Sequence, residues 1–341
     1  MDLRIDFFIK NNMKIFIFIF ILFLFIILYF NKNEFKIINS KSNIQIIFLL
    51  IILFSSILIW SLKQKSKEGM QIEIINDEIL QIRHKHVEVA GFFSGCSVKL
   101  YEIINYFNKY KTLPKKIDSS ELFLKYKYDN MKDITYDFFE HYNNRDFEFE
   151  NNKYIEIDYN CYQFDNYKLV DYDSITPFIN KYLYPSKNII EIKNDLIKKY
   201  NIKTDNCIGL YYRGTDKYKE TPIDSFESYY QKLKELTKNN NKIQILIQTD
   251  STPFLDYMKK KCLNKNIIII KENSTSSTNK GIHFEKSNSE NYTDIQNLFA
   301  TFLIISKCKY IICSSGNCSV WIMFYRNNAK NVHQNLNKKW L

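Results

Sequence analysis

The chain has 341 residues, 45% of them hydrophobic, which is enough for two domains with sizeable cores. Its formal net charge of +11 comes from lysines spread along the whole sequence, without the clustered Arg and Gly runs of many nucleic-acid-binding tails. This composition excludes a disordered chain. It favours a basic surface that attracts anionic donors or lipid head groups over one that binds nucleic acid.

Two apolar stretches near the amino terminus predict membrane attachment. Residues 15–30 are unbroken Ile, Phe, Leu and Tyr, and residues 46–62 are nearly as apolar. Each covers about 24 to 26 Å as a helix, slightly short of the hydrocarbon core but feasible in a thin membrane. We expect residues 1–62 to form an anchor of one or two transmembrane helices in an ER/Golgi-type or host membrane. The first stretch could instead be a signal segment, and lysines on every side leave the orientation open.

Residues 63–86 are polar and are expected to form a stem. The segment 87–93 then predicts a strand, Gly91–Cys96 a glycine loop, and 98–107 a helix. The backbone N–H groups of such a loop can approach a phosphate. A tight turn with small residues for packing is the alternative that the spacing alone favours.

Residues 110–184 are rich in Tyr, Asn and Asp and carry little periodic signal. Their aromatic rings either belong to the core, which we favour, or line an acceptor groove. Asp171 and Asp173 here form a D-x-D pattern. No role is assigned within this segment.

Strands and helices alternate in the second half of the chain. Helices are predicted at 188–200, 225–236, 254–262, 295–306 and 320–325. Strands are predicted around Ile208 and at 243–248, 267–270 and 310–313. This alternation is typical of an α/β fold with a parallel, doubly wound sheet.

Polar residues follow three of these strands, at Arg213–Lys217, Thr249–Ser251 and Ser314–Asn317. Because the carboxyl ends of parallel strands meet at one edge, we expect the three turns to converge on a binding site. The Arg213 guanidinium offers several coplanar donors that suit a diphosphate. The plainer alternatives are a salt bridge between Arg213 and Asp216 and helix capping by the other two turns.

Seven cysteines occur without a C-x-x-C pair and without a His at metal-ligand spacing, so a zinc site is not expected. Their odd number leaves at least one thiol unpaired in a monomer. This argues against a saturated disulfide scaffold and leaves one or two bridges open.

The peptide Leu-Tyr-Tyr-Arg213-Gly-Thr-Asp216-Lys217, followed by Ile-Gln-Thr249-Asp250 and then by Cys-Ser-Ser-Gly-Asn317, resembles the fucosyltransferase superfamily. Within that superfamily the sequence resembles the α1,6-fucosyltransferases more than the α1,2- and protein O-fucosyltransferases. Residues 91–96 are similar to the glycine loop of that family. The resemblance covers roughly residues 87–335, and Arg-x-Thr-Asp-Lys is its specific part.

The resemblance implies two Rossmann-like domains of GT-B type, an acceptor domain at 87–190 and a nucleotide-sugar-binding domain at 191–341. It also implies inverting, metal-independent transfer from GDP-fucose to a glycan or protein acceptor, without a cofactor. Arg213 would hold the β-phosphate and neutralise the leaving group, and Glu220 is the candidate general base. The other residues implied to contact the donor are Gly95, Cys96, Tyr211, Asp216, Lys217, Thr249, Asp250, Ser314, Ser315, Gly316 and Asn317.

Three positions depart from the family pattern. Its paired Arg is Arg213-Gly214 here, the His two positions before the first Arg is Tyr211, and the Asp expected to read guanine falls on Thr301. The donor could therefore be another nucleotide sugar. Alternatively, Asp294 or Glu290 could replace the missing base-reading group from nearby.

The departures leave two alternatives to an enzyme. One is a non-catalytic protein of the same fold that binds a nucleotide sugar or a glycan. The other is a membrane-tethered interaction protein with a basic surface. His283 is interpreted as a loop histidine rather than a ligand, and the sequons at Asn273 and Asn291 matter only if the domain is lumenal.

Overall fold

The computed structural model describes residues 72–74, 79–82, 91–127, 135–149, 153–217, 221–240, 242–278 and 280–335. All of them belong to the second of the two units into which the chain divides, Met70–Leu341. The predicted membrane spans at 15–30 and 46–62 lie outside these ranges, as does Glu220. Within the ranges, no helix combines the length and the apolar character needed to cross a membrane.

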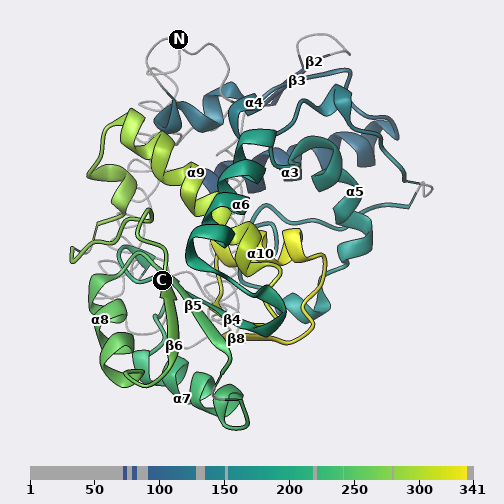
Figure 1. Cartoon of the computed structure of the whole chain (residues 1–341). Coiled ribbons are helices and arrows are strands. Elements are labelled where there is room, and N and C mark those ends of the chain that lie inside the picture. The colour runs from purple at the N-terminus through teal and green to yellow at the C-terminus, as the bar shows by residue number, and fades with distance from the viewer. Residues whose placement is uncertain are drawn as a thin grey trace, which may run out of the picture. The chain divides into compact units, whose positions relative to one another are not determined.

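A parallel sheet of five strands forms the second half of the chain, in the order β6-β5-β4-β7-β8 (Figure 1). Its strands are β4 (Cys207–Tyr212), β5 (Gln244–Thr249), β6 (Asn266–Ile269), β7 (Tyr310–Ser314) and β8 (Val332–Asn335). Every residue of β4 and β5 is buried, as expected for central strands covered on both faces. The predicted α/β class with a parallel sheet is confirmed.

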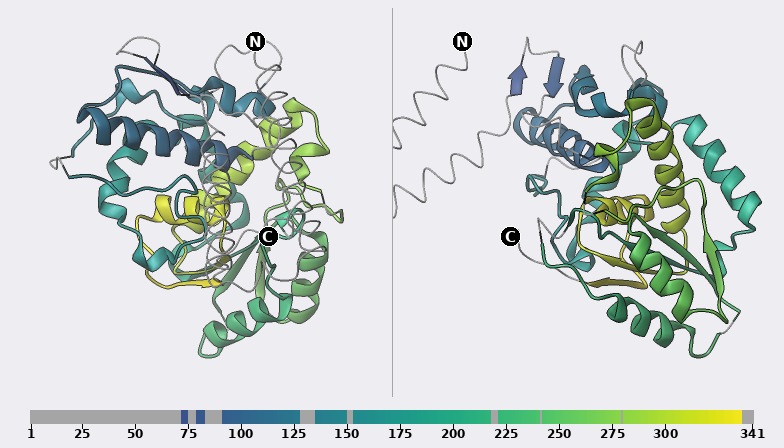
Figure 2. Two further views of the ribbon diagram at one scale, coloured as in Figure 1. Left: turned by 180° about the vertical axis from the view of Figure 1, so that it is seen from behind. Right: turned by 90° about the vertical axis from the view of Figure 1, so that its left-hand side faces the viewer.

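Helices cover both faces of this sheet (Figure 2). The surrounding helices are α6 (Lys187–Tyr200), α7 (Phe226–Thr237), α8 (Thr252–Lys261), α9 (Asn288–Ile305) and α10 (Asn317–Arg326). Tyr212 faces α7 and α8, where its ring stacks on Phe254 with centroids 4.0 Å apart. Its neighbour Tyr211 faces α9, where it contacts Phe302, because successive side chains of a strand point to opposite faces.

Most predicted helices and strands agree with the structure to within one or two residues. Three starts differ by more: the helix predicted at 98–107 begins at Phe92, α10 begins at Asn317, three residues before its predicted start, and α9 begins at Asn288, seven residues before its own. Ser287 and Glu290 form a capping box there, which satisfies the first backbone donors of a polar first turn.

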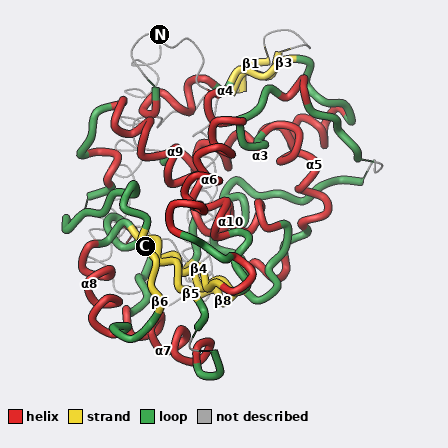
Figure 3. Tube along the Cα trace, in the orientation of Figure 1, coloured by secondary structure: helices red, strands yellow, loops and turns green. Residues whose placement is uncertain are grey.

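A smaller sheet lies in the first part of the described chain, separate from the large one (Figure 3). It contains β1 (Ile72–Ile74), β2 (Ile79–Ile82) and β3 (Lys116–Asp118). β1 pairs antiparallel with β2. β2 pairs parallel with β3, and the helix α3 (Phe92–Tyr110) lies between these two strands in the sequence. Strands thus occur within the segment that was expected to be a stem.

The predicted strand and glycine loop at 87–96 are wrong where the structure describes them. Helix α3 begins at Phe92 with Gly91 as its N-cap, so Gly95 and Cys96 lie inside the helix. A Cβ on Gly95 would lie 3.2 Å from the carbonyl oxygen of Leu122 and 3.3 Å from the ring of Phe123. The glycine therefore serves close packing, but within a helix rather than in the tight turn that the spacing favoured.

The segment between α3 and α6 is mainly core, as predicted from its aromatic residues. It contains the 3-10 turns η1 (Ser120–Tyr126), η2 (Tyr142–Asn144) and η3 (Tyr167–Leu169) and the helices α4 (Thr135–Phe138) and α5 (Tyr172–Tyr182). Phe138, Phe139, Tyr167 and Phe178 are fully buried. Asp171 caps α5 by accepting a hydrogen bond from the backbone of Ser174, which gives the D-x-D pattern a structural role. All seven cysteines are free thiols.

Candidate functional site

The three polar turns predicted to converge do meet at the carboxyl edge of the large sheet. They surround a cavity of about 380 Å³ that is also lined by α3, α9 and the loops after β5 and β6. The cavity wall includes, from the predicted site, Tyr211, Arg213, Asp216, Lys217, Asp250, Ser314, Ser315, Gly316 and Asn317. Gly95, Cys96 and Thr249 are buried outside this wall, and the Thr249 hydroxyl accepts a hydrogen bond from the backbone of Ser251.

Arg213 is held in place by two carboxylates. Its Nη2 donates to Asp216 Oδ1 at 2.7 Å, and its Nε lies 4.0 Å from Asp250 Oδ2. Asp250 also accepts hydrogen bonds from the backbone of Gly214 and from the Thr215 hydroxyl, at 2.8 and 2.7 Å. The salt bridge considered as the plainer alternative thus exists, and it aligns an arginine fork in the cavity wall.

Arg213 and Asp216 each stabilise the charged form of the other. Burial by itself would lower the pKa of Arg213, but Asp216 and Asp250 outweigh it and raise the pKa well above its ordinary value. Burial would raise the pKa of Asp216, yet the nearby guanidinium lowers it overall. Both groups are therefore charged near neutral pH.

Lys217 places a second cation at the same wall. Its side chain is buried, with Nζ 5.0 Å above the ring of Phe164. It lies beside Gly316, where a Cβ would come within 3.4 Å of Lys217 Cε. Gly316 has φ of 145°, a conformation that essentially only glycine adopts.

Residues 163–167, to which the sequence assigned no role, support this turn. The Gly316 backbone N–H donates to the Gln163 carbonyl at 2.7 Å, and the Tyr167 hydroxyl lies 3.1 Å from the same nitrogen. No periodic or motif signal in the sequence points to such a contact over about 150 residues.

We expect Gly316→Ala to cost about 1 to 3 kcal/mol of unfolding free energy, because alanine would be strained at this φ. Denaturant unfolding measures the loss. Gly91→Ala is the control, since a Cβ there meets nothing within 4 Å and its φ is −72°. Equal stability of the two variants would contradict the strain argument.

The N-termini of the helices α3 and α10 lie at the cavity. α3 begins after Gly91 and α10 after Gly316, and neither glycine offers a capping side chain. Neither first turn contains an acidic residue. The Ser97 hydroxyl joins the helices by hydrogen bonds to Asn317 Oδ1 at 2.8 Å and to Trp321 Nε1 at 2.9 Å. Together with Arg213 and Lys217, the positive ends of the two helices form a wall suited to an anion such as a diphosphate.

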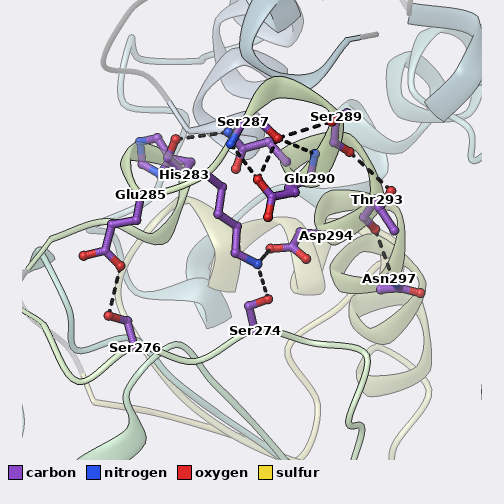
Figure 4. Close-up of polar contacts among 12 residues, drawn as sticks. Ser274, Ser276, His283, Glu285, Ser287, Ser289, Glu290, Thr293, Asp294 and Asn297 are labelled. Carbon is purple, nitrogen blue, oxygen red and sulfur yellow. Dashed lines mark hydrogen bonds and ion pairs between the residues drawn. The ribbon is translucent and has the colours of Figure 1, made fainter.

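The opposite part of the wall contains α9 and the loop after β6. Figure 4 shows Asp294 and Ser274 reaching the same ammonium group, that of Lys286. Of the two residues proposed to replace the missing base-reading group, Asp294 lines the cavity. Glu290 is instead exposed and engaged in the capping box with Ser287.

Thr301, at the position where the resemblance to fucosyltransferases implies a guanine-reading Asp, does not line the cavity. Its side chain is fully buried, and its hydroxyl donates to the Asn297 carbonyl and accepts from Asn273 Nδ2. If a nucleotide base binds in this part of the cavity, the residue that contacts it must therefore come from elsewhere on α9 or from its neighbouring loop.

His283 is a site residue that the sequence did not identify. It belongs to the 3-10 turn η6 (Ile282–Phe284) and lines the cavity (Figure 4). The side chain of Asn291 donates to the His283 carbonyl at 3.0 Å and ties this turn to α9. Asn291 is buried, and its side-chain amide, which belongs to the sequon, makes this contact within the fold.

Within the part of the chain that the structure describes, no three His, Cys, Asp or Glu side chains gather as metal ligands. Fold and cavity together define an α/β protein in which Arg213, Lys217 and two helix N-termini share a cavity with Asp216, Asp250 and Asp294 at the carboxyl edge of a parallel sheet. Neither a protein-family model nor a curated protein matches the chain. What the site does is therefore inferred from its geometry.

Proposed function

We propose that this chain is a membrane-anchored, inverting glycosyltransferase that transfers fucose from GDP-fucose to a glycan or protein acceptor without a metal ion. The observation that carries the proposal is the cavity wall in which Arg213, Lys217 and two helix N-termini face the same space. Such a wall neutralises a diphosphate by fixed positive charge and backbone dipoles.

Arg213 would act mainly when the glycosidic bond breaks. Negative charge then grows on the β-phosphate, and a guanidinium already aligned by Asp216 stabilises it without reorganisation. Lys217 and the N-termini of α3 and α10 would hold the remaining phosphate oxygens. The proposal includes a GT-B arrangement of two Rossmann-like domains and an anchor formed by residues 1–62.

The choice of GDP-fucose as the donor rests on the resemblance to fucosyltransferases. Tyr211 and Thr301 differ from the base-reading residues of that family. Asp294, with a carboxylate at the cavity wall, is the group that could accept N–H donors of a base in their place. Calorimetry with GDP and UDP would establish which base is preferred.

Donor binding gives the first test. We expect the full chain to bind GDP at one saturable site, and Lys217→Met to weaken that binding by about tenfold or more, because it removes a charge-assisted contact. Lys187→Met, on the exposed start of α6, is the control and should leave the affinity unchanged. Absence of binding to GDP, UDP and their sugars would remove the transferase proposal and favour a tethered interaction protein.

A second candidate function is binding without turnover. It is favoured by the position of Thr301, which lies outside the cavity although its family counterpart reads the base. In that case the chain would bind GDP-fucose tightly, yet release no GDP from it in the presence of glycan acceptors.

A further inference from the structure

We propose that His283 is the general base of this site and removes the proton of the acceptor hydroxyl. This inference deepens the transferase function proposed above and rests on it. It assigns to the 3-10 turn η6 a chemical role that neither the sequence pattern nor the strand ends indicated.

His283 lies close to residues that are proposed to act at the diphosphate. His283 lines the same cavity as Arg213 and Asp216. A Cβ on Gly281 would lie 2.6 Å from Asp216 Oδ2 and 2.9 Å from His283 Cε1, so both groups approach the same glycine. The imidazole is therefore a close neighbour of the carboxylate that aligns Arg213. An inverting transfer needs the acceptor and its base on the face of the sugar opposite the leaving diphosphate, so the donor sugar would lie between Arg213 and the imidazole.

The backbone of the turn that contains His283 is held in place by hydrogen bonds. The backbone carbonyl of His283 accepts a hydrogen bond from Asn291 Nδ2, and the backbone N–H of Phe284 donates to the Gly281 carbonyl. The ring of Phe284 lies 4.1 Å from the imidazole and is covered by the Lys125 ammonium at 4.2 Å. A catalytic side chain needs a backbone held in this way, because small displacements of a reacting group cost much of its effect.

The carboxylates of the same wall already accept hydrogen bonds or pair with cations. Asp216 is paired with Arg213, Asp294 with Lys286, and Asp250 accepts hydrogen bonds from Gly214 and Thr215. A carboxylate whose lone pairs already accept from a cation or an N–H is a poorer base, and the pKa of Asp216 is indeed lowered by Arg213. An imidazole ordinarily titrates nearer to neutral pH, which suits a general base.

The acceptor oxygen attacks the anomeric carbon of the donor sugar, and its proton passes to a nitrogen of the His283 imidazole. The bond between that carbon and the β-phosphate oxygen breaks, and its electron pair stays on the diphosphate beside Arg213. The products are the glycoside and GDP, and the imidazolium later loses its proton to water.

The test uses the full chain and GDP-fucose, with released GDP as the readout and either water or a panel of glycan disaccharides as acceptors. His283→Ala should lower kcat by about 10²-fold or more while leaving the affinity for GDP unchanged. Added imidazole should restore a measurable part of kcat in this variant, because it can occupy the space of the missing ring. A merely structural role would not produce such a rescue.

His333→Ala is the matched control. His333 lies on β8, where burial lowers the pKa of its imidazole, and it is not among the residues that line the cavity. We expect it to keep the wild-type kcat and to show no response to imidazole. If His283→Ala unfolds, His283→Gln preserves the shape of the side chain and should show the same loss of kcat.

The outcomes separate the two proposals. A wild-type chain that neither binds GDP nor releases it from GDP-fucose overturns the transferase function itself. A wild-type chain that turns over, while His283→Ala keeps its kcat or loses it without rescue by imidazole, overturns only the role of His283. Loss of kcat in Glu220→Gln together with an active His283→Ala would assign the base to Glu220.

Discussion

Arg213→Ala is expected to lower the turnover of GDP-fucose by about 10³-fold, equivalent to about 4 kcal/mol of transition-state stabilisation. The Arg213 guanidinium lies in the cavity wall and is aligned by Asp216 at 2.7 Å. Most of the loss should appear in kcat, because negative charge on the β-phosphate oxygen grows as the bond breaks. Steady-state release of GDP measures kcat and KM separately.

Arg213→Lys distinguishes charge from geometry. Lysine retains the positive charge but offers no planar fork, so we expect an intermediate kcat. Because alanine leaves the half-buried Asp216 carboxylate without its partner, thermal unfolding must accompany the kinetics. Undiminished turnover by a folded Arg213→Ala variant would refute the proposed mechanism.

Glu102 is expected to make the fold less stable as the pH rises. Its side chain is 2% exposed, and both carboxylate oxygens accept no hydrogen bond from any residue that the structure describes. Burial raises the pKa of this carboxyl from 4.5 to about 7. The folded state therefore binds the proton more tightly than the unfolded state, so stability is full below pH 4.5 and falls as the pH rises through 7.

This shift corresponds to a loss of roughly 2 to 3 kcal/mol of unfolding free energy between pH 5 and pH 8. Glu102→Gln should remove that share of the pH dependence, as measured by denaturant unfolding at both values. The matched control is Glu191→Gln on the exposed face of α6, where the carboxylate pairs with Lys187 at 3.8 Å. It should change the stability by less than about 1 kcal/mol at either pH. Identical pH profiles for Glu102→Gln and the wild-type chain would show that Glu102 is not buried as described.

Much of the large sheet could be predicted from local pattern. Apolar runs such as 243–248 and 310–313 end in polar turns, and parallel connectivity brings those ends to one edge. Arg213, Asp250 and Asn317 could thus be assigned to a single cavity before their contacts were known. The start of α3 could not be predicted, because Phe92 and Phe93 suit a buried strand as well as a buried helix turn.

By itself, the sequence determined the α/β class, the alternation of the second half and the strand ends that carry Arg213, Lys217 and Gly316. These follow from short-range periodicity and turn chemistry, which act within a few residues. Only the tertiary structure decided that His283 enters the cavity, that Gln163 and Tyr167 hold the Gly316 turn, and that Asp294 rather than Glu290 faces the site. Those contacts join residues far apart in the chain, and packing between elements selects them after each element has formed.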